Sequence, residues 1–361
     1  MDLLRQQIDA IADTHGLAAI GVADAHPFDE TLHVLEERVQ KGLNGSLRFT
    51  FSEPEISTDV RASFPWARRL VVASRTYLPD AGRPTADEGF AEVARFAVDD
   101  PYRPLIVALG EIASTLHSLG FEAEVLVDDN RLVDRAAAQR AGIAWAGKST
   151  MMLDPRHGPW IVLGSVVTDA PLDADEPMAR GCGTCDACIP ACPTGAIVAP
   201  GVLDARLCLA AWAQTGGIIP LELREPMGNR LYGCDDCLDA CPPGRQLLAT
   251  ATEPRGSVEL VELLGSSDDD LLNRFAHFYL PKNDADVLRR NALVVLGNQA
   301  DPRNIGALAG YLGHRNPVLR AHAAWALSRM GDERMMAALQ LAHRGETDEI
   351  VRTEIEAALD R

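Results

Sequence analysis

The chain contains 361 residues, of which 47% are hydrophobic and 24% are charged. This length fits two or three domains, and the composition is that of a globular protein, which excludes general disorder. With 52 acidic and 34 basic residues the formal net charge is -18. Such a charge excludes nucleic-acid binding over the whole surface and confines any such binding to a local patch.

The chain begins without the basic and apolar stretches of a signal peptide, and it has no uncharged apolar run of about 18 residues that would span a membrane. We therefore expect a cytoplasmic protein whose thiols stay reduced. No interface signature is visible, so we expect a monomer.

Residues 1–171 alternate between helical and strand patterns. We expect helices over 3–12, 106–119 and 132–141, the last two ending at Gly120 and Gly142, and strands over 17–22, 70–74, 121–127 and 160–168. This alternation predicts an α/β domain with two or three layers.

Residues 172–250 are rich in Cys, Pro and Gly and show little periodicity, so this segment is expected to fold around an inorganic core. All eight cysteines of the chain lie here, between Cys182 and Cys241, and such clustering points to metal rather than to disulfides. Residues 182–193 follow the pattern C-x2-C-x2-C-x3-C-P, which binds [4Fe-4S] clusters in ferredoxins.

The ferredoxin pattern divides the eight cysteines into two sets, because the fourth cysteine of a run reaches the neighbouring cluster. One set is Cys182, Cys185, Cys188 and Cys241, and the other is Cys192, Cys208, Cys234 and Cys237. The alternative is zinc, which four-cysteine sites also bind. We therefore predict a ferredoxin-like module with two [4Fe-4S] clusters, which transfers single electrons.

Residues 251–361 are helical and repetitive. Similar segments begin at Val287, Val318 and Ile350, with spacings of 31 and 32 residues. This period is typical of HEAT-like repeats, in which helix pairs stack into a small solenoid. The alternative is a plain helical bundle.

Several motifs resemble the epoxyqueuosine reductase family. They are M-G-N-R-L-Y-G-C-D-D-C at 227–237, A-G-I-A-W-A-G-K at 141–148, the pair Val127-Asp128 with Asp134-Arg135, and R-N-A at 290–292 with L-G-N at 296–298. The sequence departs from the family where Pro243 and Gly244 replace the W-N of C-P-W-N, and where Ala210 replaces a serine. Taken together, the resemblance implies an α+β multidomain protein whose first domain binds cobalamin.

The resemblance implies a reductase that converts epoxyqueuosine to queuosine at the tRNA wobble position, using cobalamin and two [4Fe-4S] clusters. Asp128 matches the family's acid and follows a predicted strand, where sites of α/β proteins usually lie. The alternative for Asp128 is an N-cap of the next helix. Asp134 is the second candidate for the acid, and its alternative is an ion pair with Arg135.

The resemblance also implies the cobalamin contacts. The cofactor is expected base-off, without a protein histidine ligand, and its candidate contacts are Arg61, Arg95, Asp128, Lys148, Ser149, Met152, Leu163, Ala210, Gln214 and Asp236. Arg95 is equally open to a structural ion pair or a contact to substrate phosphate.

Residues 282–334 carry eight basic and five acidic side chains, a local charge of +3. Arg289 and Arg320 occupy matching repeat positions, and Arg290 adjoins the first, so we expect these arginines to bind the tRNA anticodon stem-loop. The alternative is a solvated helix face with ion pairs.

The electron donor is external and unidentified. The other functions considered are a dehalogenase-like corrinoid enzyme acting on a small molecule and a ferredoxin-type electron carrier.

Overall fold

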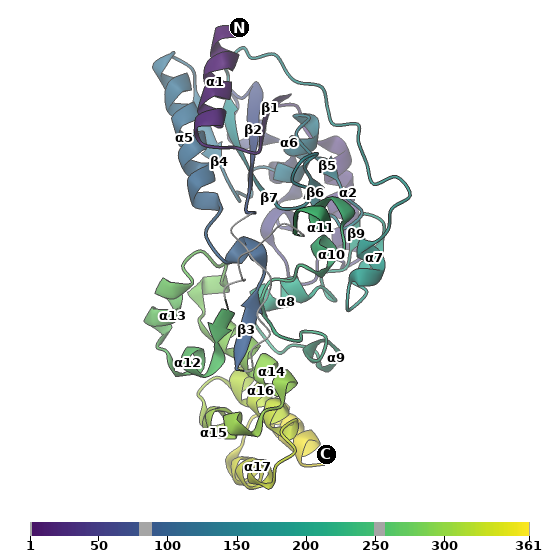
Figure 1. Ribbon diagram of the computed structural model, residues 1–361, viewed down its shortest axis with the longest axis vertical. Helices are drawn as coiled ribbons and strands as arrows, with labels where there is room; N and C mark the ends of the chain where they lie inside the picture. Colours follow the sequence, from purple (N-terminus) through teal and green to yellow (C-terminus); the bar gives the residue numbers. More distant parts are fainter. Residues whose placement is uncertain (1, 79–88, 249–256, 361) are drawn as a thin grey trace. The chain divides into compact units, whose positions relative to one another are not determined.

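The computed structural model describes residues 2–78, 89–248 and 257–360 (Figure 1). The chain forms two compact units, each built from three segments. Unit 1 comprises Met1–Ala81, Asp99–Arg206 and Asp235–Ala251, and unit 2 comprises Gly82–Val98, Leu207–Cys234 and Thr252–Arg361. The sequence led us to expect three consecutive domains instead. The expected ferredoxin-like module divides between the two units, and its expected end at residue 250 lies outside the described residues.

Unit 1 is built on a four-stranded sheet in the order β1 (Ala19–Asp24), β2 (Arg69–Thr76), β7 (Ile161–Thr168) and β4 (Ala123–Leu126). Every neighbouring pair is antiparallel. The predicted strands and helices are present. Strand ends mark functional sites in parallel sheets, so the antiparallel order of this sheet gives no such reason to expect a site at Asp128.

Alternate residues of β2 face opposite sides of this sheet, as strand geometry requires. Val71 packs with α1 (Asp2–Thr14) and α5 (Tyr102–Ser118), whereas Val72 packs with α6 (Asp134–Arg140). The sheet is thus covered on both faces, which confirms the layered α/β architecture.

Unit 1 also contains further α-helices and two pairs of short strands. They are α2 (Asp29–Gln40), α3 (Pro54–Thr58), α4 (Val60–Ser63), the hairpins β5 (Trp145–Ala146) with β6 (Met152–Leu153) and β8 (Ile197–Ala199) with β9 (Val202–Leu203), and α7 (Cys188–Ala191), α10 (Asp236–Asp239) and α11 (Pro242–Leu248). Helix α10 packs against α7, although about 50 residues separate them in the sequence.

Unit 2 contains a three-stranded sheet in which β3 (Phe90–Val93) lies between β10 (Arg230–Tyr232) and β11 (Ser257–Glu259). Strand β3 runs parallel to β10 and antiparallel to β11. Its helices are α8 (Leu209–Gln214), α9 (Leu221–Arg224), α12 (Leu260–Gly265), α13 (Asp268–Arg274), α14 (Asp286–Gln299), α15 (Ile305–Gly310), α16 (Pro317–Ser328), α17 (Glu333–Gly345) and α18 (Glu349–Leu359).

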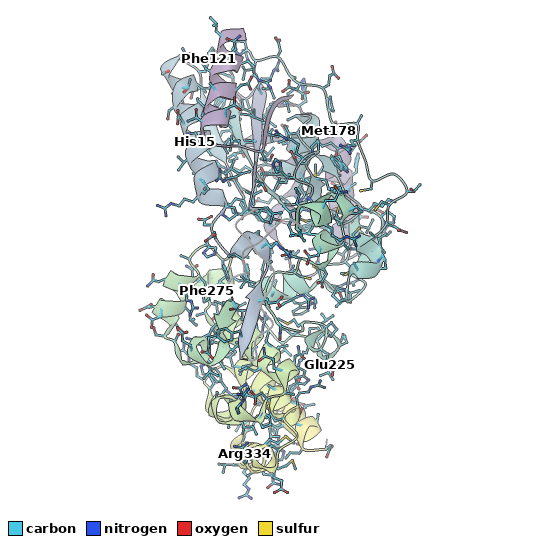
Figure 2. All side chains as sticks on the ribbon, viewed as in Figure 1. His15, Phe121, Met178, Glu225, Phe275 and Arg334 are labelled. Carbon is cyan, nitrogen blue, oxygen red and sulfur yellow. The ribbon has the colours of Figure 1, made fainter. Side chains whose placement is uncertain are left out.

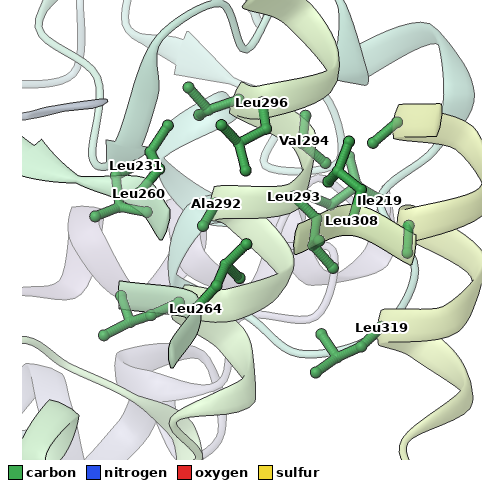
Figure 3. Close-up of a cluster of buried hydrophobic side chains, with 14 of the residues drawn as sticks. Ile219, Leu231, Leu260, Leu264, Ala292, Leu293, Val294, Leu296, Leu308 and Leu319 are labelled. Carbon is green, nitrogen blue, oxygen red and sulfur yellow. The ribbon is translucent and has the colours of Figure 1, made fainter. Parts of the chain in front are cut away.

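The three segments with a repeated pattern lie on α14, α16 and α18, and α16 packs against both of the others. Figure 3 shows part of the apolar core of unit 2, where Leu293 and Leu296 of α14 belong to one cluster with Ile219 and Leu231 from the segment between Cys208 and Cys234. Among the described residues, no helix has both the length and the apolar character needed to cross a bilayer.

Candidate functional site

The four cysteines of the first predicted set gather where α10 packs against α7. Burial, together with the charges of the other three thiolates, raises the pKa of Cys241 to about 11. An electrostatic effect of this kind requires Cys182, Cys185 and Cys188 to lie close to Cys241. None of the eight cysteines, all within the described part of the chain, forms a disulfide. The structure therefore brings four free thiols into one region of unit 1.

The chain behind Cys241 is held by a buried tryptophan. Trp160 Nε1 donates to Gly244 O at 3.0 Å, and a Cβ at Gly244 would lie 2.8 Å from that same nitrogen. Only glycine allows so close an approach. This contact gives a physical reason for glycine at position 244, where the sequence departs from the family pattern.

The second predicted set is divided between the units. Cys192 and Cys237 belong to unit 1, and Cys208 and Cys234 belong to unit 2. Cys192 Sγ accepts the backbone N–H of Ala196 at 3.2 Å. Cys208 directly precedes α8, and Cys234 follows β10 after one glycine.

The loop between β5 and β6 carries Lys148 and folds as a tight turn. Gly147 N donates to Met151 O at 2.8 Å, and a Cβ at Gly147 would lie 2.9 Å from that oxygen. Lys148 O accepts the N–H of Gly201 at 2.9 Å. Burial raises the pKa of Cys188, and the charge of Lys148 acts in the opposite direction, so the ammonium lies near this thiol.

Asp128 follows β4 with a left-handed backbone, at φ 51°. Partial burial, and to a lesser extent the charge of Asp129, raises its pKa. The N-cap interpretation of Asp128 is wrong, because Val133 occupies the N-cap of α6 and no side chain caps it. Asp129 instead pairs with Arg131 at 2.6 Å.

Asp134 is the first residue of α6, and its Oδ1 is buried without a hydrogen-bond partner in the described structure. Burial and then the charge of Asp128 raise its pKa well above the ordinary value, so the two carboxyl groups lie close together. The alternative, a direct ion pair with Arg135, is not formed in the described structure, although the charge of Arg135 opposes the rise in the pKa of Asp134. Arg135 Nη1 donates to Thr150 O at 2.8 Å, which connects α6 to the Lys148 loop.

The hydrogen bond from Arg135 to Thr150 O was not predicted from the sequence, because no motif indicates which backbone carbonyl a guanidinium will reach. The contact brings Asp128, Asp134 and the Lys148 loop into one region of unit 1. The loop in turn approaches Cys188 of the first thiol set.

The other predicted cofactor contacts fall into two groups. Those accessible at least in part are Arg61, Leu163 and Asp236 in unit 1, and Ala210 and Gln214 on α8 in unit 2. Met152 is buried in the apolar core, Ser149 is 6% exposed, and Arg95 is 4% exposed in unit 2. These three side chains face the interior of their units, and their contacts with a cofactor or a phosphate stay predictions.

The predicted RNA-binding arginines have internal partners. Arg290 is 1% exposed, Arg289 pairs with Asp268 and Asp286, and Arg320 pairs with Glu346. Their expected role in binding phosphate is wrong, since their guanidinium groups are committed to these partners. Sequence composition registers their charge but not their burial.

Two other arginines of unit 2, Arg315 and Arg334, are exposed, unlike the three arginines predicted to bind RNA. Arg334 on α17 (Figure 2) pairs with Asp332 at 2.9 Å, and its side chain is 64% exposed. Arg315 is 79% exposed and lies 3.4 Å from Asp268.

Two family models match the chain. Residues 181–244 match the 4Fe-4S double cluster binding domain, and residues 279–360 match HEAT repeats. The first match favours iron–sulfur clusters over zinc, and the second confirms HEAT repeats over a plain bundle.

Full-length relatives are also found. An epoxyqueuosine reductase of Bacillus cereus is 31% identical over 99% of this chain and 97% of its own length. A crystal structure of epoxyqueuosine reductase with an epoxyqueuosine-modified tRNA-Tyr stem loop superposes with a TM-score of 0.91 at 30% identity, over 99% of this chain and 98% of that one. A Bacillus subtilis structure with its catalytic loop swung out of the active site gives 0.89 at 29% identity, with the same coverage.

Proposed function

The chain belongs to the epoxyqueuosine reductase family, and we propose that it reduces epoxyqueuosine to queuosine at the wobble position of tRNA. The observation that carries this proposal is the match, over 99% of the chain, to a relative solved with an epoxyqueuosine-modified tRNA stem loop. Full-length similarity also disfavours a ferredoxin-type carrier, because the matched region extends far beyond the cluster module.

Two [4Fe-4S] clusters are the proposed electron relay. The four free thiols of Cys182, Cys185, Cys188 and Cys241 lie in one region of unit 1, and four thiols are the donor set that one cluster requires. The ferredoxin spacing assigns Cys192, Cys208, Cys234 and Cys237 to the other. Lys148 stabilises negative charge near Cys188, which favours the reduced form of the first cluster.

Cobalamin is the proposed site of reduction, and the residues of unit 1 fit it. The buried Oδ1 of Asp134 has no donor in the described structure, and the carboxamide rim of a corrin supplies N–H donors. Asp134, Lys148 and Arg61 are accordingly the polar groups proposed to hold the cofactor. Cobalamin, when bound, accepts electrons singly and delivers them in pairs.

Asp128 is the proposed general acid. Removal of the epoxide oxygen as water requires two electrons and two protons, so a proton donor must face the leaving oxygen. The raised pKa of Asp128 keeps its carboxyl protonated at a higher pH than an ordinary aspartate. The charge of an ionised Asp128 would in turn disfavour ionisation of the neighbouring Asp134.

The proposed partners are the tRNA anticodon stem-loop and an external electron donor. The proposed location is the cytoplasm, where tRNA is modified, and the proposed state is a monomer. No protein histidine is proposed as a cobalt ligand.

Nucleoside analysis of tRNA tests the function. A deletion strain is expected to accumulate epoxyqueuosine in place of queuosine, and the wild-type gene is expected to restore queuosine. Normal queuosine in the deletion strain would contradict the proposal. Cobalamin binding is tested separately, by the visible spectrum of anaerobically purified protein with added cobalamin.

A further inference from the structure

One buried amide in unit 2 connects the elements that flank Cys208 and Cys234. Asn291 of α14 is fully buried, and its Nδ2 donates to Ala213 O at 2.9 Å and to Leu231 O at 2.8 Å. Ala213 lies on α8, which Cys208 precedes, and Leu231 lies on β10, which ends shortly before Cys234. The two hydrogens of a single amide therefore join the two elements that carry these cysteines.

The neighbouring Arg290 holds the same segment and orients this amide. Its Nη2 donates to Trp212 O at 2.6 Å, and its Nη1 donates to Gly217 O at 2.9 Å. Its Nη2 also donates to Asn291 Oδ1 at 2.7 Å, so that the Nδ2 of the amide faces the backbone carbonyls. Burial lowers the pKa of Arg290 to about 9. A guanidinium this deeply buried is retained only where its hydrogen bonds are satisfied.

The next repeat contributes a third contact. His322 of α16 is fully buried, its Nε2 accepts the N–H of Ile219 at 3.2 Å, and its Nδ1 lies 2.7 Å from Val318 O. The N–H of Ile219 requires an acceptor, so the ring is neutral with its proton on Nδ1. Two repeat helices thus fix the backbone between the two cysteines by hydrogen bonds.

We propose that Arg290 and Asn291 are positioning residues for the second iron–sulfur cluster, which hold Cys208 and Cys234 at the separation that the cluster requires. The repeats are thereby the scaffold of a redox centre. This inference rests on the proposed assignment of both cysteines to one cluster. The first cluster is independent of these contacts, because its four cysteines all belong to unit 1.

The test measures iron, sulfide and the EPR spectrum of the full chain after anaerobic reconstitution. Wild-type protein is expected to hold about eight iron atoms and Asn291→Ala about four. Cys208→Ala provides the spectrum of a protein that lacks only the second cluster, and Asn291→Ala is expected to reproduce it. Arg290→Lys keeps the charge and reaches one carbonyl at most, so its second-cluster occupancy is expected to lie between those of wild type and Asn291→Ala.

Arg320→Gln is the matched control, because it breaks a mostly buried ion pair in the next repeat, at the position that matches Arg289, without touching residues 208–234. It is expected to keep about eight iron atoms. Full iron content in Asn291→Ala, or equal loss of both clusters in Asn291→Ala and Arg320→Gln, overturns the proposal. If Cys208→Ala itself keeps both clusters, the assignment of Cys208 to the second cluster fails. This result is distinguishable from a failure of the positioning role, in which Cys208→Ala loses the second cluster but Asn291→Ala keeps it.

Discussion

Asp128 combines a left-handed backbone with a carboxyl group of raised pKa, and these two properties determine which substitution tests it. Asparagine tolerates positive φ far better than most residues, so Asp128→Asn keeps the loop geometry and removes only the acid. We expect turnover to fall by about 10²-fold or more, with cobalamin binding retained. Near-normal turnover would reject Asp128 as the acid.

The pH dependence of stability distinguishes Asp134 from Asp129. The folded-state pKa of Asp134 is raised, so the stability it contributes is present below its ordinary pKa and is lost as the pH rises through the folded value. Asp134→Asn, which cannot ionise, is therefore expected to raise the melting temperature of cobalamin-free protein at neutral pH, with a gain that shrinks towards about pH 4.

Asp129→Asn is the control, because its effect on stability is expected to change with pH in the opposite direction. The hydrogen bond from Arg131 lowers the pKa of Asp129, so its stabilisation is present at neutral pH and is lost as the pH falls. Identical pH profiles for the two variants would contradict these assignments.

At the scale of elements, a glycine sets the distance between α14 and α16. A Cβ at Gly297 would lie 2.6 Å from Trp325 Cζ3 and 2.9 Å from Ala326 Cα, so Gly297→Ala is expected to cost about 1–3 kcal/mol through overpacking. Gly306 of α15 has no atom within 4 Å of its Cβ position. Gly306→Ala is expected to stabilise by about 0.5–1 kcal/mol. Denaturant unfolding measures both, and equal effects would count against close packing at Gly297.

The sequence predicted elements better than their arrangement. Gly120 and Gly142 end helices as expected, and both adopt the left-handed conformation that glycine favours, at φ 87° and 74°. The antiparallel order of the first sheet was not predictable, because alternating helices and strands do not determine strand direction. The burial of Arg290 escaped prediction, since its partners are backbone carbonyls more than 70 residues away.

At the scale of the whole molecule, acid is expected to weaken the repeats through Glu346. The hydrogen bonds from Arg320 lower the pKa of Glu346 to about 2, so this stabilisation is present above about 4.5 and is lost as the pH falls towards about 2. Both side chains are mostly buried. Arg320→Gln is expected to cost on the order of 3 kcal/mol at neutral pH, because it leaves an uncompensated charge.

Urea unfolding of Arg320→Gln at pH 7 and pH 3 measures this prediction. The cost should shrink at the lower pH, where Glu346 becomes partly neutral without its partner. Arg334→Gln provides the control, because its ion pair with Asp332 is exposed and should contribute little. A cost for Arg320→Gln that does not change with pH would point to lost packing instead.

The position of β3 has a consequence for synthesis on the ribosome. This strand ends at Val93, but its partners β10 and β11 begin at Arg230 and Ser257. At roughly 5–20 residues per second, a nascent chain carries β3 without a partner for roughly 7–30 s. During that interval the strand exposes hydrogen-bonding groups that invite pairing with other chains. The interleaved order of the two units thus makes chaperone protection of the growing chain an expected requirement for its production.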